Sequence, residues 1–196
     1  MHHATNKLRK KQVHAGEFLI SMPKLRGSFF GDSLIYLWAH DEDGAQGLVV
    51  NHPFDLTLAE LMKQLDMPAA ANLAGKVVSG GPVDPQQGFI LHTDDVSVEG
   101  SQPAAGAGGV GLTVSYSREM LELIATERGP NRFLLALGYA GWGAGQLEQE
   151  LAEGAWLTAP SSHDVLFETP FEQRLDRVAH QLGIDWRLFA SDGGLA

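Results

Sequence analysis

The clearest structural signal in the chain is the stretch Gly138-Tyr139-Ala140-Gly141-Trp142-Gly143-Ala144-Gly145-Gln146-Leu147-Glu148-Gln149-Glu150-Leu151. It follows Phe133-Leu134-Leu135-Ala136-Leu137, an apolar run typical of a buried strand. Glycines then recur at near-alternate positions, and glycine permits backbone angles and close approaches that other residues avoid. Leu147 and Leu151 stand one helical turn apart. The pattern therefore predicts a buried strand, a tightly shaped glycine loop over Gly138–Gly145, and a helix.

Shorter apolar runs on both sides of this stretch predict further strands. They are Glu17–Ser21, Ser33–Ala39, Gln46–Asn51, Lys76–Ser79, Gln87–His92, Gly111–Ser115 and Ala155–Ala159. The region from Val96 to Gly111 is rich in Gly, Ala and Ser, which favours an exposed connection.

Three more helices are expected from apolar stripes and start signals. Thr57-Leu58-Ala59-Glu60 has capping-box spacing before the first of them. Ser117 begins the second, which ends before Gly129-Pro130. In Thr169-Pro170-Phe171-Glu172, we expect Thr169 to cap the third, with Pro at the first helical position.

The order of these elements predicts an α/β protein of the α+β type. Strands and helices mix without regular βαβ alternation, which argues against a TIM barrel or a simple Rossmann sheet. We expect one compact unit over residues 16–190, with a mixed, largely antiparallel sheet and about four helices. A basic arm (1–15) and a short tail (191–196) should flank it.

Composition limits the partners. The chain has 196 residues, no cysteine and a formal net charge of −10. Four of its 14 basic residues lie in Lys7–Lys11, so the remainder carries a charge of −14. Such a body repels phosphate backbones, which predicts weak, sequence-independent nucleic-acid binding at most, through the arm. With no apolar run of membrane-spanning length and no signal peptide, we expect a cytoplasmic protein without membrane association.

Catalytic motifs are weak. Ser79 lacks the preceding glycine of a G-x-S-x-G elbow, and nothing in the sequence ties His92 or His163 to it. The formal G-x-G-x-x-G at Gly106–Gly111 lacks the strand before it and the helix after it that dinucleotide binding requires. No pattern of metal ligands occurs. We therefore expect no cofactor and no metal.

A polar-aromatic pocket is the remaining hypothesis. Gln146 and Glu150 lie one helical turn apart beside two aromatic residues, and two other strand ends could converge on them. The predicted ligand-binding set is Asn51, Ser79, Gly80, Gly81, Tyr139, Trp142, Gln146 and Glu150. The alternative is that the glycines serve only the close packing of loop against sheet.

Five segments also carry a family resemblance: Gly138–Trp142, Gly145–Glu148, Trp156, Gly47–Asn51 and Ser79–Val83. In this order, and from Gly16 to Gly183, the chain resembles the bacterial AlgH/YqgE family. The resemblance implies an α/β fold with a bifurcated sheet and no settled activity, although some members carry a transcriptional-regulator label.

Three functions remain open on this basis. The first is a non-catalytic binding or regulatory protein with an unidentified ligand or protein partner, of unknown oligomeric state. The second is a hydrolase-like enzyme using Ser79, His92 or Glu150. The third is a transcriptional regulator, for which the sequence offers no helix-turn-helix with a basic second helix.

Overall fold

The computed structural model describes residues 13–107 and 110–186. Its strands are β1 (Glu17–Ser21), β2 (Leu34–Asp41), β3 (Gly44–Val49), β4 (Pro53–Thr57), β5 (Lys76–Ser79), β6 (Val83–Thr93), β7 (Gln102–Ala107), β8 (Val110–Ser115), β9 (Phe133–Gly143) and β10 (Trp156–Pro160). Its helices are the 3₁₀ turn η1 (Pro23–Leu25), α1 (Leu58–Gln64), α2 (Arg118–Ala125), α3 (Gln146–Ala152), α4 (His163–Phe167) and α5 (Phe171–Gln181). Residues 1–12 of the predicted arm and the whole tail lie outside the described residues, whereas Val13 is 3% exposed and packs in the core cluster that contains Leu19.

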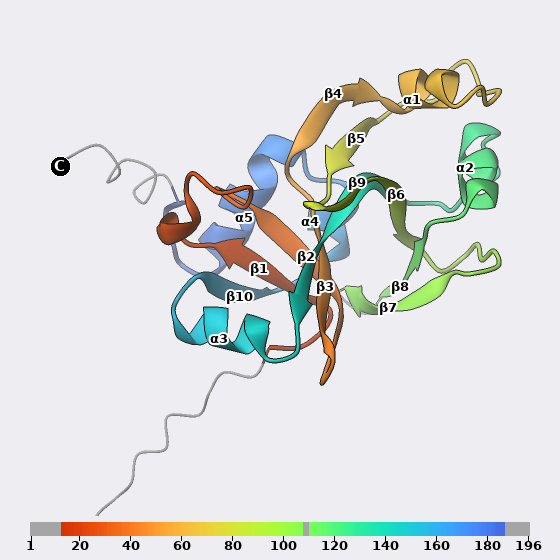
Figure 1. Ribbon diagram of the computed structural model, residues 1–196. Helices are drawn as coiled ribbons and strands as arrows, with labels where there is room; N and C mark the ends of the chain where they lie inside the picture. The colour runs from red at the N-terminus through yellow and green to blue at the C-terminus, as the bar shows by residue number, and fades with distance from the viewer. Residues whose placement is uncertain (1–12, 108–109, 187–196) are drawn as a thin grey trace, which may run out of the picture.

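The strands form one mixed sheet that forks at β9 (Figure 1). The first half of β9 pairs with β5 in parallel, at Val78↔Ala136, and its second half pairs with β3, at Gly47↔Ala140. The opposite edge of β9 pairs with β6. Every other pair among the described strands is antiparallel. The predicted α+β class and the bifurcated, largely antiparallel sheet are confirmed, with five α-helices in the described part rather than about four.

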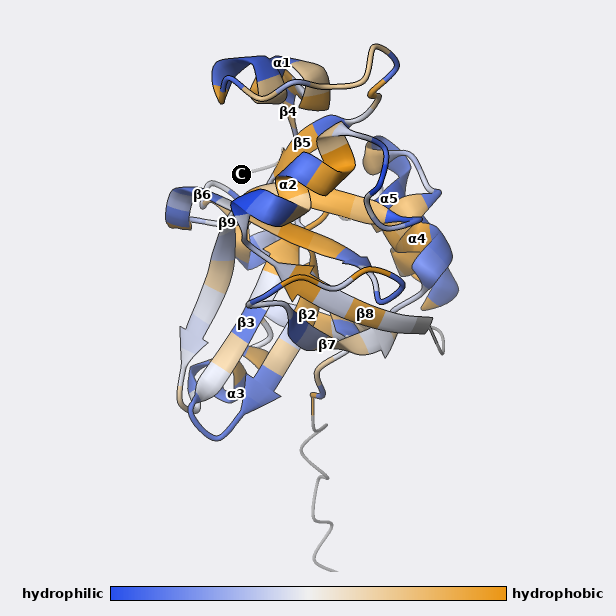
Figure 2. Ribbon diagram, turned by 90° about the vertical axis from the view of Figure 1, so that its right-hand side faces the viewer, coloured by the Kyte–Doolittle hydropathy of each residue, from blue (hydrophilic) through white to orange (hydrophobic). Residues whose placement is uncertain are grey.

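Helices cover the sheet on both faces, and alternate strand residues point to different cores. Phe18 and Ile20 of β1 join the cluster beneath α4 and α5. Leu19, between them, faces the cluster that contains Leu147 of α3. A third cluster packs α1 and α2 against β5, β6 and the first half of β9. Figure 2 shows the strand segments beside α2 and α5 as mostly hydrophobic, and the strand ends near α3 as a mixture of hydrophilic and hydrophobic residues.

Two predicted helix starts have different outcomes. The Thr57–Glu60 capping box is confirmed, because Glu60 N donates to Thr57 Oγ1 (3.2 Å) and Thr57 N donates to Glu60 Oε2 (2.8 Å). The predicted cap at Thr169 is wrong. Its hydroxyl donates to the Asp164 carbonyl instead (3.1 Å), and α5 has Pro170 at its N-cap position without a side-chain acceptor.

The glycine-rich stretch also differs from its prediction. β9 continues through Gly138, Gly141 and Gly143, so the predicted loop shrinks to a turn that ends at Gly145, where φ is 72°. The alternating spacing of these glycines suits a strand because side chains alternate between its two faces. The expected exposed connection after Val96 likewise contains the β7–β8 hairpin. No helix in the described residues is long and apolar enough to cross a membrane.

Candidate functional site

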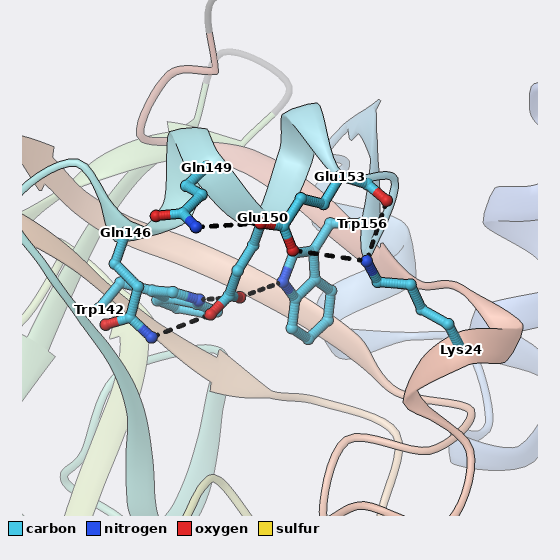
Figure 3. Close-up of polar contacts among 7 residues, drawn as sticks. All are labelled: Lys24, Trp142, Gln146, Gln149, Glu150, Glu153 and Trp156. Carbon is cyan, nitrogen blue, oxygen red and sulfur yellow. Dashed lines mark hydrogen bonds and ion pairs between the residues drawn. The ribbon is translucent and has the colours of Figure 1, made fainter.

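Trp142, Gln146 and Glu150 of the predicted set form one hydrogen-bonded cluster, which Trp156 joins (Figure 3). Glu150 Oε2 accepts from Trp142 Nε1 at 2.9 Å and from Trp156 Nε1 at 2.7 Å. Gln146 Nε2 donates to Glu150 Oε1 at 2.9 Å, and Gln146 Oε1 accepts from Gly143 N at 3.0 Å. Each side chain therefore has partners inside the protein.

The two indoles of this cluster are part of the core. Trp142 is 6% exposed and Trp156 is 2% exposed. Their rings meet edge to face at 5.8 Å, and Phe30 packs on both. A buried indole N–H needs an acceptor, and Glu150 serves both rings at once. The geometry supports a structural tie between α3, β9 and β10.

Asn51 and Ser79 lie at strand ends away from this cluster. Asn51 Oδ1 accepts from Leu34 N at 2.8 Å, and its Nδ2 donates to the Asp32 carbonyl at 2.9 Å. Ser79 N donates to the His52 carbonyl at 2.8 Å. The structure does not bring either side chain to Glu150 through any hydrogen bond among the described residues.

Gly80 and Gly81 lie where β5 passes β9 at the fork. A Cβ at Gly80 would lie 2.3 Å from the Gly138 carbonyl oxygen, and one at Gly81 would lie 1.9 Å from the Tyr139 carbonyl carbon. These distances leave no room for a side chain, so both glycines are required by backbone contact alone. Their predicted role in ligand binding stays a prediction.

Tyr139 has a different environment, because it lies on the face of β9 opposite Trp142. Its ring packs against Trp38 of β2 (5.8 Å) and Phe89 of β6 (5.2 Å). It lines two hollows, of about 390 and 330 Å³, which share Tyr139 and Gln46. We call them the Tyr139 hollows. Trp142 also lines the larger one.

Three polar side chains in the Tyr139 hollows face solvent and make no hydrogen bond within the described part of the protein. Among the described residues, the Gln46 amide, the Asp84 carboxylate and the Tyr139 hydroxyl have no hydrogen-bond partner. Asp41 and Asp43 line the larger hollow, and Asp84 lines the smaller. No Lys, Arg or His is among the described residues that line either one. The hollows therefore combine aromatic walls with a negative field.

Sequence reasoning missed Trp38, Gln46, Asp84, Phe89 and Tyr116 as lining residues. They come from four segments that meet only through pairing across the sheet. One local signal was present: Gln46 is a polar residue in an apolar strand, and it pairs directly with Gly141. Since Gly141 has no side chain, the space above that pair stays open, bounded by the Tyr139 ring.

The three residues of the enzyme alternative lie apart. His92, fully buried, donates from Nδ1 to the Thr93 carbonyl (2.7 Å) and accepts at Nε2 from the Ser115 hydroxyl (2.8 Å), while Ser115 accepts from Ser101 (2.8 Å). Burial lowers the pKa of His92, which favours the neutral ring. The Ser115–His92 bond resembles that of a nucleophile and its base, but both side chains are fully buried from any substrate.

Comparison with known proteins identifies relatives over nearly the whole chain. The family model described as DUF179, AlgH-like, matches residues 18–187. A UPF0301 protein of Thioalkalivibrio sulfidiphilus is 44% identical over 181 residues, covering 92% of this chain and 95% of its own. A UPF0301 protein of Shewanella oneidensis is 43% identical over 182 residues, with 90% and 95% covered.

Solved structures agree with these matches. The solution structure of the AlgH protein from Pseudomonas aeruginosa is similar over 100% of both chains, with a TM-score of 0.74 and 37% identity. A crystal structure of a Corynebacterium diphtheriae protein, DIP2367, shares the fold at a TM-score of 0.65, with 20% identity over 92% of this chain and 93% of that one. The resemblance noted in the sequence is thus confirmed, and the chain belongs to the AlgH-like family.

Proposed function

We propose that the protein is a non-catalytic binding protein whose ligand site is the pair of Tyr139 hollows. The observation that carries the proposal is the set of solvent-facing polar groups there, on Gln46, Asp84 and Tyr139, which have no partner among the residues that the structure describes and are set among aromatic rings. Binding sites commonly combine apolar walls with a few convergent polar groups. This site keeps Tyr139 of the predicted set and assigns Gln146, Glu150 and the Trp142 indole a supporting role.

The ligand class follows from the walls. Trp38, Phe89 and Tyr139 present aromatic rings, and Asp84 with Asp41 and Asp43 supplies negative charge without a compensating cation among the lining residues. An organic ammonium gains from both, through attraction to the ring faces and to the carboxylates. We infer an amine with an apolar body, or a partner's segment that presents one.

The test compares phenethylamine with its uncharged counterpart 2-phenylethanol. Binding is followed by ¹H–¹⁵N chemical shifts of the Trp38 indole and the Gln46 side-chain amide. Phenethylamine should shift both signals and 2-phenylethanol should bind more weakly. Asp84→Asn, which keeps a residue tolerant of positive φ, should weaken amine binding by about threefold, the scale of one exposed charge pair.

Asp55→Asn is the matched control, because Asp55 is a fully exposed carboxylate on β4 and lines neither hollow. It should leave amine binding unchanged. Equal binding of the alcohol and the amine, or shifts that are confined to other parts of the protein, would rule out this ligand class. Native mass spectrometry of protein from its own host then identifies the retained ligand.

The two other functions receive less support. Glu150 and His92 are engaged within the fold, which removes two of the three residues considered for an enzyme. For a DNA-binding regulator, the two arginines of α5 are also engaged, Arg174 with backbone carbonyls and Arg177 with Asp164.

A further inference from the structure

A second cavity lies beside the first half of β9, away from the Tyr139 hollows. Its volume is about 390 Å³. The lining comes from the start of β9, from β5, and from α4 and the beginning of α5. Much of it is apolar, including Phe133, Leu166, Phe167 and Phe171. A cavity of this size and composition suits a small organic molecule.

Arg174 is the unusual residue in this lining. It is only 4% exposed. Its Nε donates to the Thr169 carbonyl at 2.9 Å, its Nη1 donates to the Val50 carbonyl at 2.5 Å, and its guanidinium lies 4.3 Å from the centre of the Phe171 ring. Among the described residues, no carboxylate forms an ion pair with it and nothing accepts from its Nη2. Burial lowers the pKa of Arg174 to about 10, so it is charged at neutral pH.

A buried cation without a counter-ion is costly. In most proteins a carboxylate within ion-pair distance offsets that cost. Here desolvation has the larger effect on the pKa of Arg174 and lowers it, and the charge of Glu172 raises that pKa by a smaller amount. The guanidinium therefore lines a cavity with donor capacity to spare, which is the arrangement expected where the counter-ion is supplied by a ligand.

The other charged side chains around the cavity are mostly positive, like Arg174. Lys76 and Arg132 also line it, and Glu168, paired with Arg132 at 2.6 Å, is its one carboxylate among the described lining residues. Lys76 has a 3.9 Å contact to a fully exposed Asp55 and a minor electrostatic interaction with Glu60. In a chain whose net charge is −10, this lining is positive overall. A positive region on a protein whose net charge is negative attracts anions.

The beginning of α5 adds hydrogen-bond donors. Pro170 and Phe171 line the cavity, and the N-cap position provides no side-chain acceptor because Thr169 is turned toward Asp164. Among the described residues, nothing accepts from the backbone amides of Phe171 and Glu172. The first turn of a helix with free amides favours a negative group.

We propose that this cavity binds an organic carboxylate with an apolar body, its head group on Arg174 and its body against the aromatic and aliphatic lining. The proposal is independent of the amine site, since none of the residues that line this cavity lines the Tyr139 hollows. A monocarboxylate fits better than a phosphate because one guanidinium matches one carboxylate and the remaining lining is mostly apolar.

The experiment uses the full chain and octanoate, with 1-octanol and inorganic phosphate as comparison ligands. Binding is followed by ¹H–¹⁵N shifts of Arg174 Nε–H and of the backbone amides of Phe171 and Glu172. Millimolar octanoate should shift all three signals, and 1-octanol should not shift the Arg174 signal. Lys76→Gln, a substitution on an accessible side chain, should weaken octanoate binding by about threefold.

Arg118→Gln is the matched control, because Arg118 is an exposed cation on α2 that does not line the cavity. It should bind octanoate like the wild type. Arg174→Lys keeps the charge but loses the paired geometry, and it should weaken binding more than Lys76→Gln does. The proposal fails if octanol moves the Arg174 signal as octanoate does, if phosphate binds better than octanoate, or if Lys76→Gln and Arg118→Gln are equivalent.

Discussion

Removing the Glu150 carboxylate is the sharpest test of the cluster that joins α3 to the sheet. In Glu150→Ala, the indole N–H groups of Trp142 and Trp156 lose their common acceptor. A buried donor left unsatisfied costs about 1–3 kcal/mol. Water entering the vacated space recovers part of this. We therefore expect the free energy of unfolding to fall by about 3 kcal/mol.

Glu153→Ala is the matched control at the C-terminal end of the same helix. Glu153 is exposed, and its carboxylate lies 3.7 Å from Lys24 Nζ, so its loss should change stability by less than about 0.5 kcal/mol. Both variants are measured by urea unfolding, followed by tryptophan fluorescence and by far-ultraviolet circular dichroism, so that a local change around the two rings is separated from global unfolding.

Glu150→Gln gives an intermediate case. Its amide keeps one oxygen for the indoles but presents N–H donors to the Gln146 Nε2 group, which is also a donor. The decrease in the free energy of unfolding caused by Glu150→Gln should therefore lie between those of Glu150→Ala and Glu153→Ala. If Glu150→Ala and Glu153→Ala unfold at the same urea concentration with equal slopes, the carboxylate does not hold this part of the fold together and the assignment is refuted.

Three further predictions concern other parts of the chain. Gly81→Ala should destabilise the protein by about 3 kcal/mol or more in urea titrations, because its Cβ meets the β9 backbone, whereas Gly88→Ala, with open space around it, should cost far less. The pKa of His92 is lowered in the folded state, so the unfolded state binds the extra proton, and stability should fall as the pH drops below about 6.5. His92→Gln should remove that component of the pH dependence. The urea midpoint is measured for both proteins in neutral and in mildly acidic buffer, and the decrease between the two buffers should be smaller for the variant than for the wild type. Deleting residues 1–12, which include Lys7–Lys11 and leave the buried Val13 in place, should abolish any gel shift with DNA at physiological salt; specific nanomolar binding that survives the deletion would contradict the charge argument.

Local patterns predicted much of the fold because their physics is local. The Thr57–Glu60 box satisfies the free amides of its own helix, so four residues are enough to recognise it. The apolar runs at Glu17–Ser21 and Lys76–Ser79 became strands with the bounds expected of them. The α+β class followed from the order of such elements.

The structure of the glycine-rich stretch was harder to predict, because a loop and a continued strand can both have alternating glycines. Alternating glycines suit a loop, yet β9 extends to Gly143 because β3 supplies a partner strand far away in the sequence. Thr169 shows the same limit, since its hydroxyl could accept from a backbone N–H of α5 or donate to the Asp164 carbonyl, and the folded protein has the second arrangement. Neither outcome is visible in a short window of sequence.

The candidate site was predicted only in part for the same reason. Tyr139 and Trp142 are neighbours along β9, but alternation along the strand directs them to opposite faces. Glu150 was identified as important, and its partner Trp156 lies only six residues on, yet a carboxylate shared by two indoles looks in sequence like any exposed helical acid. Gln46 and Asp84 reach the hollows only through the pairing of β3 and β6 with β9.

The fork at β9 also has a consequence for how the protein is made. On a ribosome, β1 to β6 emerge before the strand that joins β3, β5 and β6 has been synthesised. Until Gly143 has left the exit tunnel, the apolar edges of those earlier strands have no native partner. Long-range pairing of this kind closes late and leaves a nascent chain open to aggregation. We therefore expect the nascent chain to depend on chaperones up to that length and to become resistant to proteases only after β9, and then β10, has been added.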